Sequence, residues 1–437
     1  MGAGAPFEHM STVNIGYSEA SLGAPRCVSW DLDGATIVVG TTGNALLLLY
    51  GEGMYAGGSG NHEVGTEMQP HVFVQPLVRG HHGKILRVAA HPTEPVFATI
   101  STDKTLRLWN SQKKAQIALT RLAERATAVE FTRDGACLVI GNENGEILIV
   151  KYNALDESKS AKNAKTQGMP GLQTLQVEEL GAAAGSGMHE KQWQVVLRRH
   201  VAAKPGHATP GAKAGATSSA GAPVGSAAPP SVLNRKRSEV TELKFSPDGD
   251  VLAVGCRDNL IHLLSVHNSY KRAAVCRGHS SYIRSIDFSA DGRVLQATDA
   301  VRELLFWEVS TGKQVANAAH TRDVDWASGR CALGWHVQGI FNGPAGVPVD
   351  GEMNAVCRSK DKNLLVAGGS NTVNNAVKLF RYPCVGKAIP SMHGGHTCPV
   401  LDVIFLAHDS GVVTVGGSDS TIFTWSLVHE RGSSRSS

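Results

Sequence analysis

The sequence predicts an all-β protein, a seven-bladed β-propeller that carries a long disordered insertion. The first supporting observation is a pattern of three short apolar strands separated by polar turns, which occurs seven times along the 437 residues. The second is the 48 glycines, which suit many tight turns between short strands. Units of this size cannot bury their apolar faces alone, so they must stack. Radial closure of the stack leaves only short, protected edges, as in a propeller.

The seven copies follow one another along the chain. The first strands cover 27–34, 86–95, 126–135, 240–249, 283–292, 353–362 and 400–410. The third strands cover 44–50, 105–110, 146–152, 260–266, 303–309, 376–382 and 421–427, and each copy has a second strand in between. Short runs rich in β-branched residues and bounded by turns are typical of strands. The segment WQVVLRRH (193–200) is expected to form the outer strand of the third blade.

The last copy lacks an outer strand of its own, because only the polar tail VHERGSSRSS follows 421–427. The segment STVNIGYS (11–18) precedes the first strand of the first copy. We expect this segment to pair with the last blade and to join the two ends of the ring. The chain then divides into an amino-terminal segment, 1–24, and a propeller, 25–437.

Four polar positions recur in some copies and indicate repeats of the WD type. In the second copy Gly80-His81, Ser101, Asp103 and Trp109 match the hydrogen-bonded set of such a repeat. The fifth and last copies carry part of the set, with Gly417 at the hydroxyl position of the last. The residues assigned a structural role inside the blades are His81, Ser101, Asp103, Trp109, His279, Trp307, His396, Asp419 and Trp425.

No pattern in the sequence favours an enzyme, a cofactor or a metal site. The eight cysteines are scattered and form no CxxC pair, and no phosphate loop, GxSxG or HExxH motif is present. His393 and His396 have a ligand-like spacing, but the repeat already accounts for His396. No apolar run approaches the roughly 20 residues of a membrane span, and no secretory signal is visible, so a cytoplasmic protein is expected.

Positive charge is concentrated in one insertion. Residues 151–237 contain 12 Lys plus Arg and 5 Asp plus Glu, a balance of +7; the chain totals +4, so the remainder carries 4 − 7 = −3. The Ala/Gly/Pro-rich stretch at about 201–233 is predicted to be disordered, because it cannot bury enough apolar surface to offset chain entropy. The candidate basic arm consists of Arg198, Arg199, Lys204, Lys213, Arg235, Lys236 and Arg237.

Two interpretations of this arm stay open. It can be a solvated linker, or it can attract an acidic partner surface through charge. Basic residues here do not alternate with aromatic ones, and the rest of the chain is slightly acidic, so no dedicated nucleic-acid site is expected.

A further insertion, 316–352, is specific enough to indicate a family. DVDWASGRCALGWHVQGIF, followed by MNAVCRS, LLVAGG, VKLFRYPC and GGH, resembles the carboxy-terminal propeller of the echinoderm microtubule-associated protein-like family. The similarity covers about residues 278–427. The resemblance implies a WD-repeat propeller that works by binding proteins. Trp326 and Trp335, inside the insertion, are expected in the core rather than at a contact surface.

The function expected from the resemblance is that of a microtubule-associated protein, with tubulin or a cytoskeletal or axonemal assembly as partner. The basic arm would then face acidic tubulin surfaces. The implied location is the cytoplasm, on the cytoskeleton. The alternative is a WD-repeat adaptor of another protein complex that does not bind microtubules directly, since one fold serves many functions.

Overall fold

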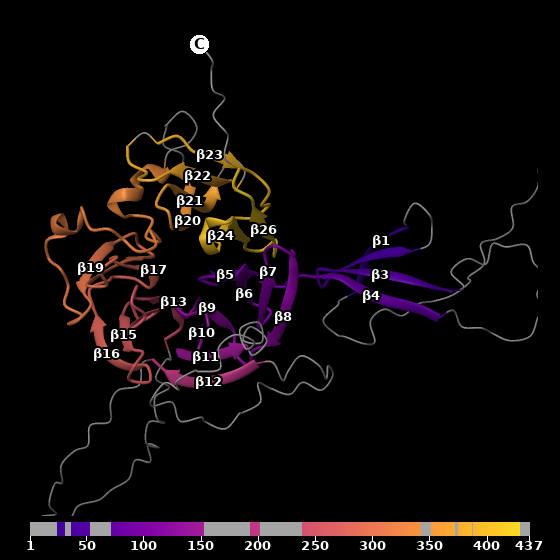
Figure 1. Cartoon of the computed structure of the whole chain (residues 1–437), viewed down its shortest axis with the longest axis horizontal. Coiled ribbons are helices and arrows are strands. Elements are labelled where there is room, and N and C mark those ends of the chain that lie inside the picture. Colours follow the sequence, from indigo (N-terminus) through magenta and orange to yellow (C-terminus); the bar gives the residue numbers. More distant parts are fainter. Residues whose placement is uncertain are drawn as a thin grey trace, which may run out of the picture.

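The structure is a computed structural model, and it describes residues 24–30, 36–52, 71–152, 193–201, 238–341, 351–371, 375–386 and 388–428. Figure 1 shows the whole chain. The expected ring-closing strand at 11–18 and most of the expected disordered insertion lie outside these residues. Within them, no helix is long and apolar enough to cross a membrane.

The described strands form seven antiparallel sheets, in chain order. The first sheet contains β1 (Pro25–Trp30), β2 (Ile37–Thr41), β3 (Ala45–Glu52) and β4 (His71–Arg79). The second contains β5 (Ile85–Ala90), β6 (Val96–Ser101), β7 (Thr105–Asn110) and β8 (Ala115–Arg121). The third contains β9 (Ala126–Phe131), β10 (Leu138–Asn142), β11 (Glu146–Tyr152) and β12 (Trp193–His200).

The remaining four sheets follow the same plan. The fourth contains β13 (Val240–Phe245), β14 (Val251–Cys256), β15 (Ile261–Ser265) and β16 (Lys271–Cys276). The fifth contains β17 (Ile283–Phe288), β18 (Val294–Asp299) and β19 (Leu304–Glu308). The sixth contains β20 (Gly351–Arg358), β21 (Leu364–Asn371), β22 (Val377–Arg381) and β23 (Ser391–His393), and the seventh β24 (Val400–Phe405), β25 (Val412–Gly416) and β26 (Ile422–Trp425).

The all-β fold and the propeller class predicted from the sequence are confirmed. Each predicted first, second and third strand corresponds to a strand of one sheet, and β12 spans the predicted outer strand, 193–200. The strands are short because each ends where the sequence supplies a turn. In β14, for example, the apolar run stops at Cys256 and the turn places Asn259 at φ 64°, a conformation that asparagine tolerates well.

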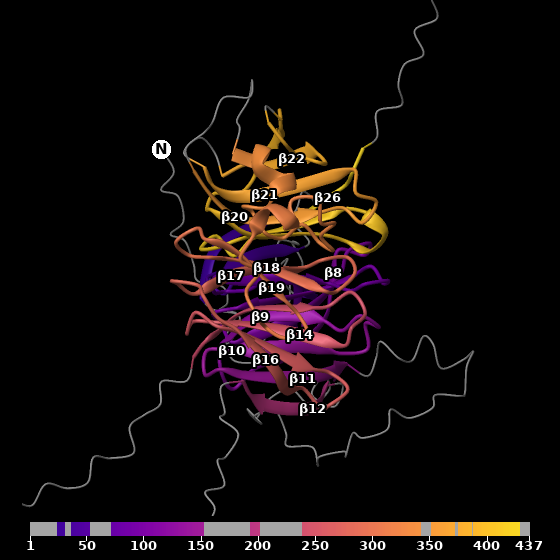
Figure 2. The ribbon, with the colours of Figure 1, turned by 90° about the vertical axis from the view of Figure 1, so that its left-hand side faces the viewer.

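Apolar clusters join most neighbouring sheets. One cluster packs the second sheet on the third, a second packs the third on the fourth, and a third packs the fourth on the fifth. The sixth sheet packs on the seventh in the same way. The seventh then packs directly on the second, where Val413 and Val415 meet Ile85, Val88 and Phe97. Figure 1 shows the resulting ring, and Figure 2 shows it from the side.

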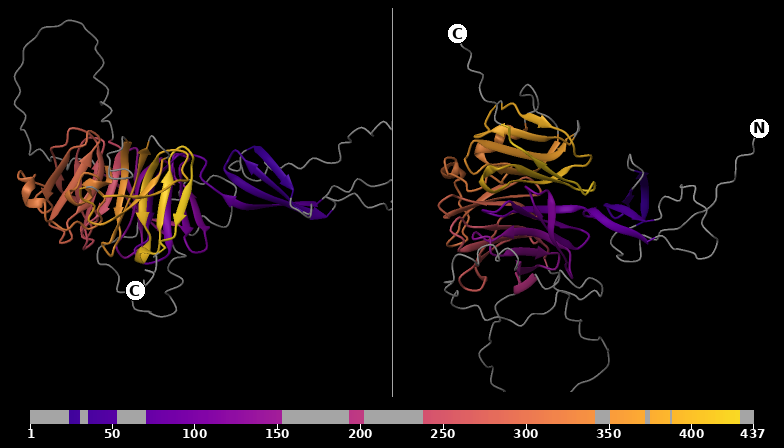
Figure 3. Two further views of the ribbon diagram at one scale, coloured as in Figure 1. Left: turned by 90° about the horizontal axis from the view of Figure 1, so that it is seen from above. Right: turned by 45° about the vertical axis from the view of Figure 1, so that its right-hand side comes forward.

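The first sheet lies beside the ring rather than between the last and the second sheets, as Figure 3 shows from two directions. It has a small separate core of buried residues, which consists of Val39, Ala45, Leu47 and Leu49. Strand β1 is exposed along its length, with Val28 and Trp30 exposed by 67% and 56%. The reason is that β24 and β25 already cover the apolar face of β5.

A wedge fills the space between the fifth and sixth sheets. We use this name for residues 318–341, which include the short 3-10 helices η3 (Ala318–Thr321) and η4 (Trp335–Phe341). The N–H of Ala327 donates to the carbonyl of Phe288, at the end of β17, over 2.8 Å. The N–H of Arg358, at the end of β20, donates to the carbonyl of Ser328 over 3.0 Å. The wedge therefore bonds to the first strands of both sheets.

Candidate functional site: polar sets of the blades and the wedge

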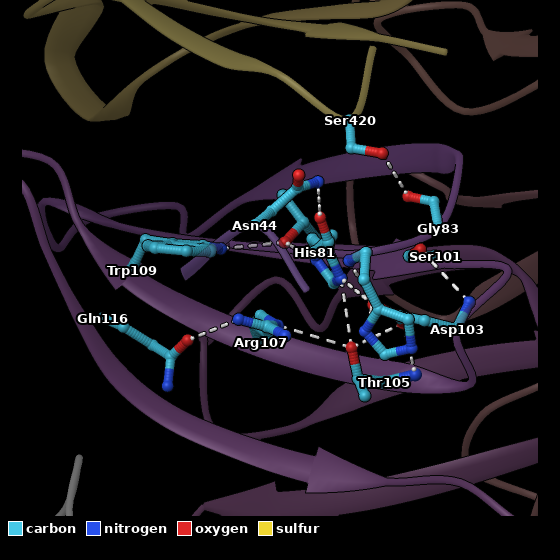
Figure 4. A network of polar contacts seen from close by, with 12 residues as sticks. Asn44, His81, Gly83, Ser101, Asp103, Thr105, Arg107, Trp109, Gln116 and Ser420 are labelled. Atoms are coloured by element: carbon cyan, nitrogen blue, oxygen red, sulfur yellow. Dashed lines mark hydrogen bonds and ion pairs between the residues drawn. The ribbon is translucent and has the colours of Figure 1, made fainter. Parts of the chain in front are cut away.

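The polar set of the second sheet is complete and buried (Figure 4). Nδ1 of His81 lies 3.0 Å from Oδ2 of Asp103, and Nε2 of His81 lies 2.8 Å from Oγ1 of Thr99. The indole N–H of Trp109 donates to the same Thr99 hydroxyl over 2.8 Å. The Thr105 hydroxyl donates to Oδ1 of Asp103 over 2.6 Å. The set thus links β6, β7 and the loop that enters β5.

The pKa shifts of this set fit a neutral histidine beside an ionised carboxylate. Burial lowers the pKa of His81, against the opposing effect of Asp103. Burial alone would raise the pKa of Asp103, but the hydrogen bonds from His81 and Thr105 hold it well below its usual range. A neutral ring donates from Nδ1 to Asp103 and accepts at Nε2 from Thr99, which leaves Thr99 free to accept from Trp109. Every member then has a partner.

The role assigned to Ser101 is corrected by this geometry. The hydroxyl between the histidine and the tryptophan belongs to Thr99, whereas Ser101 accepts the N–H of Asp103 over 3.2 Å. Residues two apart in a strand share a face, so the sequence pattern alone did not separate the two hydroxyls. In β6, Thr99 pairs with Arg107 and Phe97 pairs with Trp109, which places Thr99 within reach of the indole.

The last sheet repeats this arrangement. Nε2 of His396 lies 2.8 Å from Oγ1 of Thr414, to which the Trp425 indole also donates over 2.8 Å. Asp419 lies 3.6 Å from Nδ1 of the same histidine. Gly417, placed at the hydroxyl position by the sequence pattern, is corrected to Thr414.

The fifth sheet carries an incomplete set. Ala297 stands opposite Leu305, at the position that corresponds to Thr99, so no hydroxyl is available. The indole of Trp307 therefore donates to the carbonyl of Arg277 over 3.0 Å. His279 keeps Asp299 at 3.3 Å, and burial lowers the pKa of His279. All three sets link residues within their own blades.

Buried charges at the centre of the ring form a second polar region. Arg87 on β5 lies 3.3 Å from Glu242 on β13, and Lys244 on β13 lies 2.9 Å from Glu130 on β9. Burial raises the pKa of Glu242, partly offset by Arg87. These pairs join strands of the second, third and fourth sheets and satisfy charges that would be costly to bury alone.

A wedge residue, Arg330, supplies the positive charge that pairs with the seventh sheet at this centre. Arg330 pairs with Asp402 on β24 at 3.0 Å and donates to the carbonyl of Val403 over 2.8 Å. Burial alone would lower the pKa of Arg330, but the carboxylates of Asp402 and Glu242 raise it. Asp402 also accepts the N–H of Val88 on β5 over 3.1 Å. One buried carboxylate thus joins the last sheet, the second sheet and the wedge.

The two tryptophans of the wedge have different surroundings. Trp326 is buried and packs on Phe306 at 6.0 Å between ring centroids, as expected for a core residue. Trp335 is exposed by 38%, so the core position expected for it is wrong. Two backbone hydrogen bonds attach η4 to the segment around Cys384, where Val385 and Ile389 are exposed by 54% and 67%. Trp335, Val385 and Ile389 are named the wedge patch below.

The basic residues assigned to the arm fall into two groups. Arg198 and Arg199 lie on β12, the outer strand of the third sheet, where Arg198 is exposed. Lys204, Lys213, Arg235, Lys236 and Arg237 lie outside the described residues.

The polar sets and the ring of antiparallel sheets define a WD-repeat β-propeller protein, and residues 73–110 match the family model of the WD domain, G-beta repeat. Residues 223–427 match the family model described as the echinoderm microtubule-associated protein second beta-propeller. The resemblance indicated by the sequence is confirmed, and the matched part includes the wedge.

Curated relatives of this chain are named for the same family. The chain is 28% identical over 397 residues to echinoderm microtubule-associated protein-like 2 of Rattus norvegicus, covering 90% of this chain and 46% of the relative. It is 38% identical over 195 residues to echinoderm microtubule-associated protein-like 1 of Homo sapiens, covering 44% of this chain and 23% of the relative. It is 27% identical over 417 residues to echinoderm microtubule-associated protein-like 3 of Homo sapiens, covering 94% of this chain and 36% of the relative. The chain therefore spans less than half the length of these relatives.

One solved structure aligns with most of the chain at low identity. The β-propeller domain of Cps50 (Swd1) from Myceliophteria thermophila aligns with 93% of this chain and 98% of its own, at 11% identity and a TM-score of 0.41.

Proposed function

We propose that this chain is a non-enzymatic WD-repeat scaffold that binds microtubules on the cytoskeleton. The observation that carries the proposal is the match of residues 223–427 to the second propeller of a family named for microtubule association. The match includes the wedge, a segment that general WD repeats lack. The histidines and aspartates of the polar sets are engaged inside their blades, which supports binding rather than catalysis.

The wedge patch is the first proposed contact surface. Its three apolar side chains lie on segments joined by backbone hydrogen bonds, namely Gly339 N–H to Cys384 carbonyl over 2.9 Å and Cys384 N–H to His336 carbonyl over 2.8 Å. Tryptophan is enriched among the residues that contribute most to protein interfaces. Exposed apolar groups held on a firmly bonded support lose little conformational freedom on binding.

The basic arm is the second proposed contact, through charge. It leaves the third sheet at Val201, whose N–H donates to the carbonyl of Gly145 over 3.0 Å. It returns at Ser238, whose carbonyl lies 2.6 Å from the position of a Cβ on Gly145. Both ends therefore lie beside Gly145, so a short Gly/Ser linker can replace residues 202–237 without stretching the ring.

Microtubule co-sedimentation across a salt series tests the arm. Arg235→Gln, Lys236→Gln and Arg237→Gln together should weaken binding at 0.05–0.1 M salt and change little near 1 M, where the screening length is roughly 3 Å. The charge-matched control neutralises three exposed arginines outside the arm, namely Arg293, Arg302 and Arg322. Equal weakening by both triple variants would mean that the arm contributes only net charge.

Substitution of the wedge patch tests the apolar contact. Trp335→Ser with Ile389→Ser should lower binding at all salt concentrations, whereas the control pair Val301→Ser and Val428→Ser, exposed by 60% and 87%, should not. If the folded wild-type chain fails to pellet with microtubules at low salt, direct binding is wrong. The adaptor function then replaces it, with a different protein on the same patch.

A further inference from the structure

Three side chains with metal-ligating atoms converge at one end of the fourth sheet. They are the thiol of Cys256 at the end of β14, the carboxylate of Asp258 in the following turn and the imidazole of His262 on β15. Their ligand atoms all lie within 4.8 Å of one another, and Nε2 of His262 lies 3.6 Å from Oδ2 of Asp258. The residues are spaced Cys-x-Asp-x3-His, so one hairpin supplies the whole cluster.

Among the residues that the structure describes, the buried His262 has no hydrogen-bond partner. Its side chain is 3% exposed, and neither ring nitrogen makes a hydrogen bond to any of them. A buried polar group in this state costs about 1–3 kcal/mol. The thiol of Cys256 and the carboxylate of Asp258 offer ligand atoms within 4.8 Å of the imidazole, so a cation placed among the three would give a ring nitrogen a partner.

Comparison with the second sheet shows why the polar set of the blade does not explain this cluster. By strand register, Cys256 corresponds to Ser101 and His262 corresponds to Arg107. In the second sheet the aspartate of the turn is paired with His81, which comes from the loop before β5. In the fourth sheet the residue at the same sequence offset before β13 is Lys236, not a histidine. His262, on the strand itself, lies beside the carboxylate instead.

The chemistry of the three ligands fits zinc. Thiolate, imidazole and carboxylate bind Zn²⁺ at about 2.0–2.3 Å, which puts tetrahedral ligand atoms roughly 3.3–3.8 Å apart. The distance between His262 and Asp258, 3.6 Å, lies in this range, and all three ligand atoms lie within 4.8 Å of one another. Magnesium and calcium prefer oxygen ligands alone. Burial raises the pKa of the Cys256 thiol, and the nearby Asp258 raises it further. A bound divalent cation reverses this shift, because it stabilises the thiolate.

We propose that Cys256, Asp258 and His262 form a zinc-binding site, with the fourth coordination position open to water on the side of the exposed Asp258. On binding, the thiol proton leaves to solvent, and Nε2 of His262 coordinates as the neutral imidazole. The cation then holds the β14–β15 hairpin closed. The proposal stands apart from microtubule binding, because the site lies in the fourth sheet, whereas the wedge patch lies on η4 and on the segment between β22 and β23.

Titration of the metal-free full chain with Zn²⁺, against a chromophoric chelator, tests the site. Wild type should bind one ion there and gain thermal stability, and Co²⁺ in its place should give the near-ultraviolet band of a cobalt–thiolate bond. Cys256→Ser should remove the band. Asp258→Asn, in an exposed turn, should lower affinity at least tenfold with the fold intact. Cys276→Ser is the matched control, since it changes another buried thiol of the same sheet.

The outcomes are distinct. Loss of zinc affinity in Asp258→Asn and His262→Gln, with Cys276→Ser unchanged, supports the site. Absence of binding by wild type, or equal binding by all variants, overturns it. Selective loss in Glu303→Gln would place the ion at the trio His279, Asp299 and Glu303 in the fifth sheet and would equally overturn the proposal.

Discussion

At the scale of single residues, one hydroxyl decides how complete each polar set is. Thr99 and Thr414 each serve a histidine and a tryptophan at once, whereas Ala297 leaves the fifth sheet without this bridge. The histidine and the aspartate are equally present in all three sheets. The threonine of the second strand is therefore the member whose loss distinguishes a complete set from a partial one.

Thr99→Val should lower the free energy of unfolding by about 1–3 kcal/mol, because it removes one partner from each of two nitrogens, on His81 and on Trp109. Ser101→Ala removes a single acceptor and should cost less. Urea unfolding of both variants measures the difference. A larger loss in Ser101→Ala would restore Ser101 to the central place that the sequence pattern gave it.

Acid should weaken the protein through the three buried histidines. Burial lowers the pKa values of His81, His279 and His396 below the ordinary 6.5, so the unfolded chain binds more protons than the folded chain as the pH falls below 6.5. The stability they contribute is present above pH 6.5 and is lost as the pH falls toward the folded values. Melting temperatures from pH 8 to pH 5 measure this loss. His396→Gln should make the melting temperature depend less on pH than the control His267→Gln, which changes an exposed histidine.

At the scale of elements, the wedge bridges the fifth and sixth sheets, which also meet directly where Arg284 on β17 donates to Asn354 on β20 over 2.9 Å. It bonds to the ends of β17 and β20 and sends Arg330 to the last sheet. Ser328 donates to Asp287, a carboxylate whose pKa burial raises. The wedge is thus held by buried polar contacts on several strands, which explains how it can expose Trp335 without loosening.

Arg330→Met should destabilise the fold by about 3–5 kcal/mol, because it leaves Asp402 buried without its cation. Arg322→Met changes an exposed arginine of the same wedge and should stay within about 0.5 kcal/mol of wild type. Chemical unfolding of both variants gives the comparison. Equal stability of the two would show that Asp402 is satisfied by Val88 and Val403 alone.

At the scale of the whole molecule, the ring closes without the first sheet. An apolar cluster joins the last and second sheets, and hydrogen bonds from the Asn44 side chain to the His81 carbonyl and from the Gly80 N–H to the Asn44 carbonyl tie the first sheet to the chain that enters the second. Its exposed strand β1 is an open edge, a feature that natural proteins normally cover or charge.

A chain shortened to residues 80–437 should therefore remain folded, with a melting temperature within a few degrees of the full chain. The physical reason is that the clusters joining the ring contain no residue of the first sheet. Differential scanning calorimetry measures the change. Loss of cooperative unfolding would show that the first sheet belongs between the last and the second sheets.

The sequence by itself determined the sheets and their order. Short β-branched runs and turn residues are local features, so the strand positions, the outer strand at 193–200 and the repeat type all followed from the sequence. The family resemblance followed from the wedge residues in the same way. The histidines, aspartates and tryptophans of the polar sets were recognisable because each occupies a fixed offset from a turn.

Only the tertiary structure decided which surfaces meet. Whether Thr99 or Ser101 reaches the indole depends on strand register, and the exposure of Trp335 depends on what covers η4. The place of the first sheet depends on competition between β1 and β24 for the face of β5, and the convergence of Cys256, Asp258 and His262 depends on hairpin geometry. Such choices rest on contacts between residues far apart in the chain or on side-chain direction, neither of which a local pattern encodes.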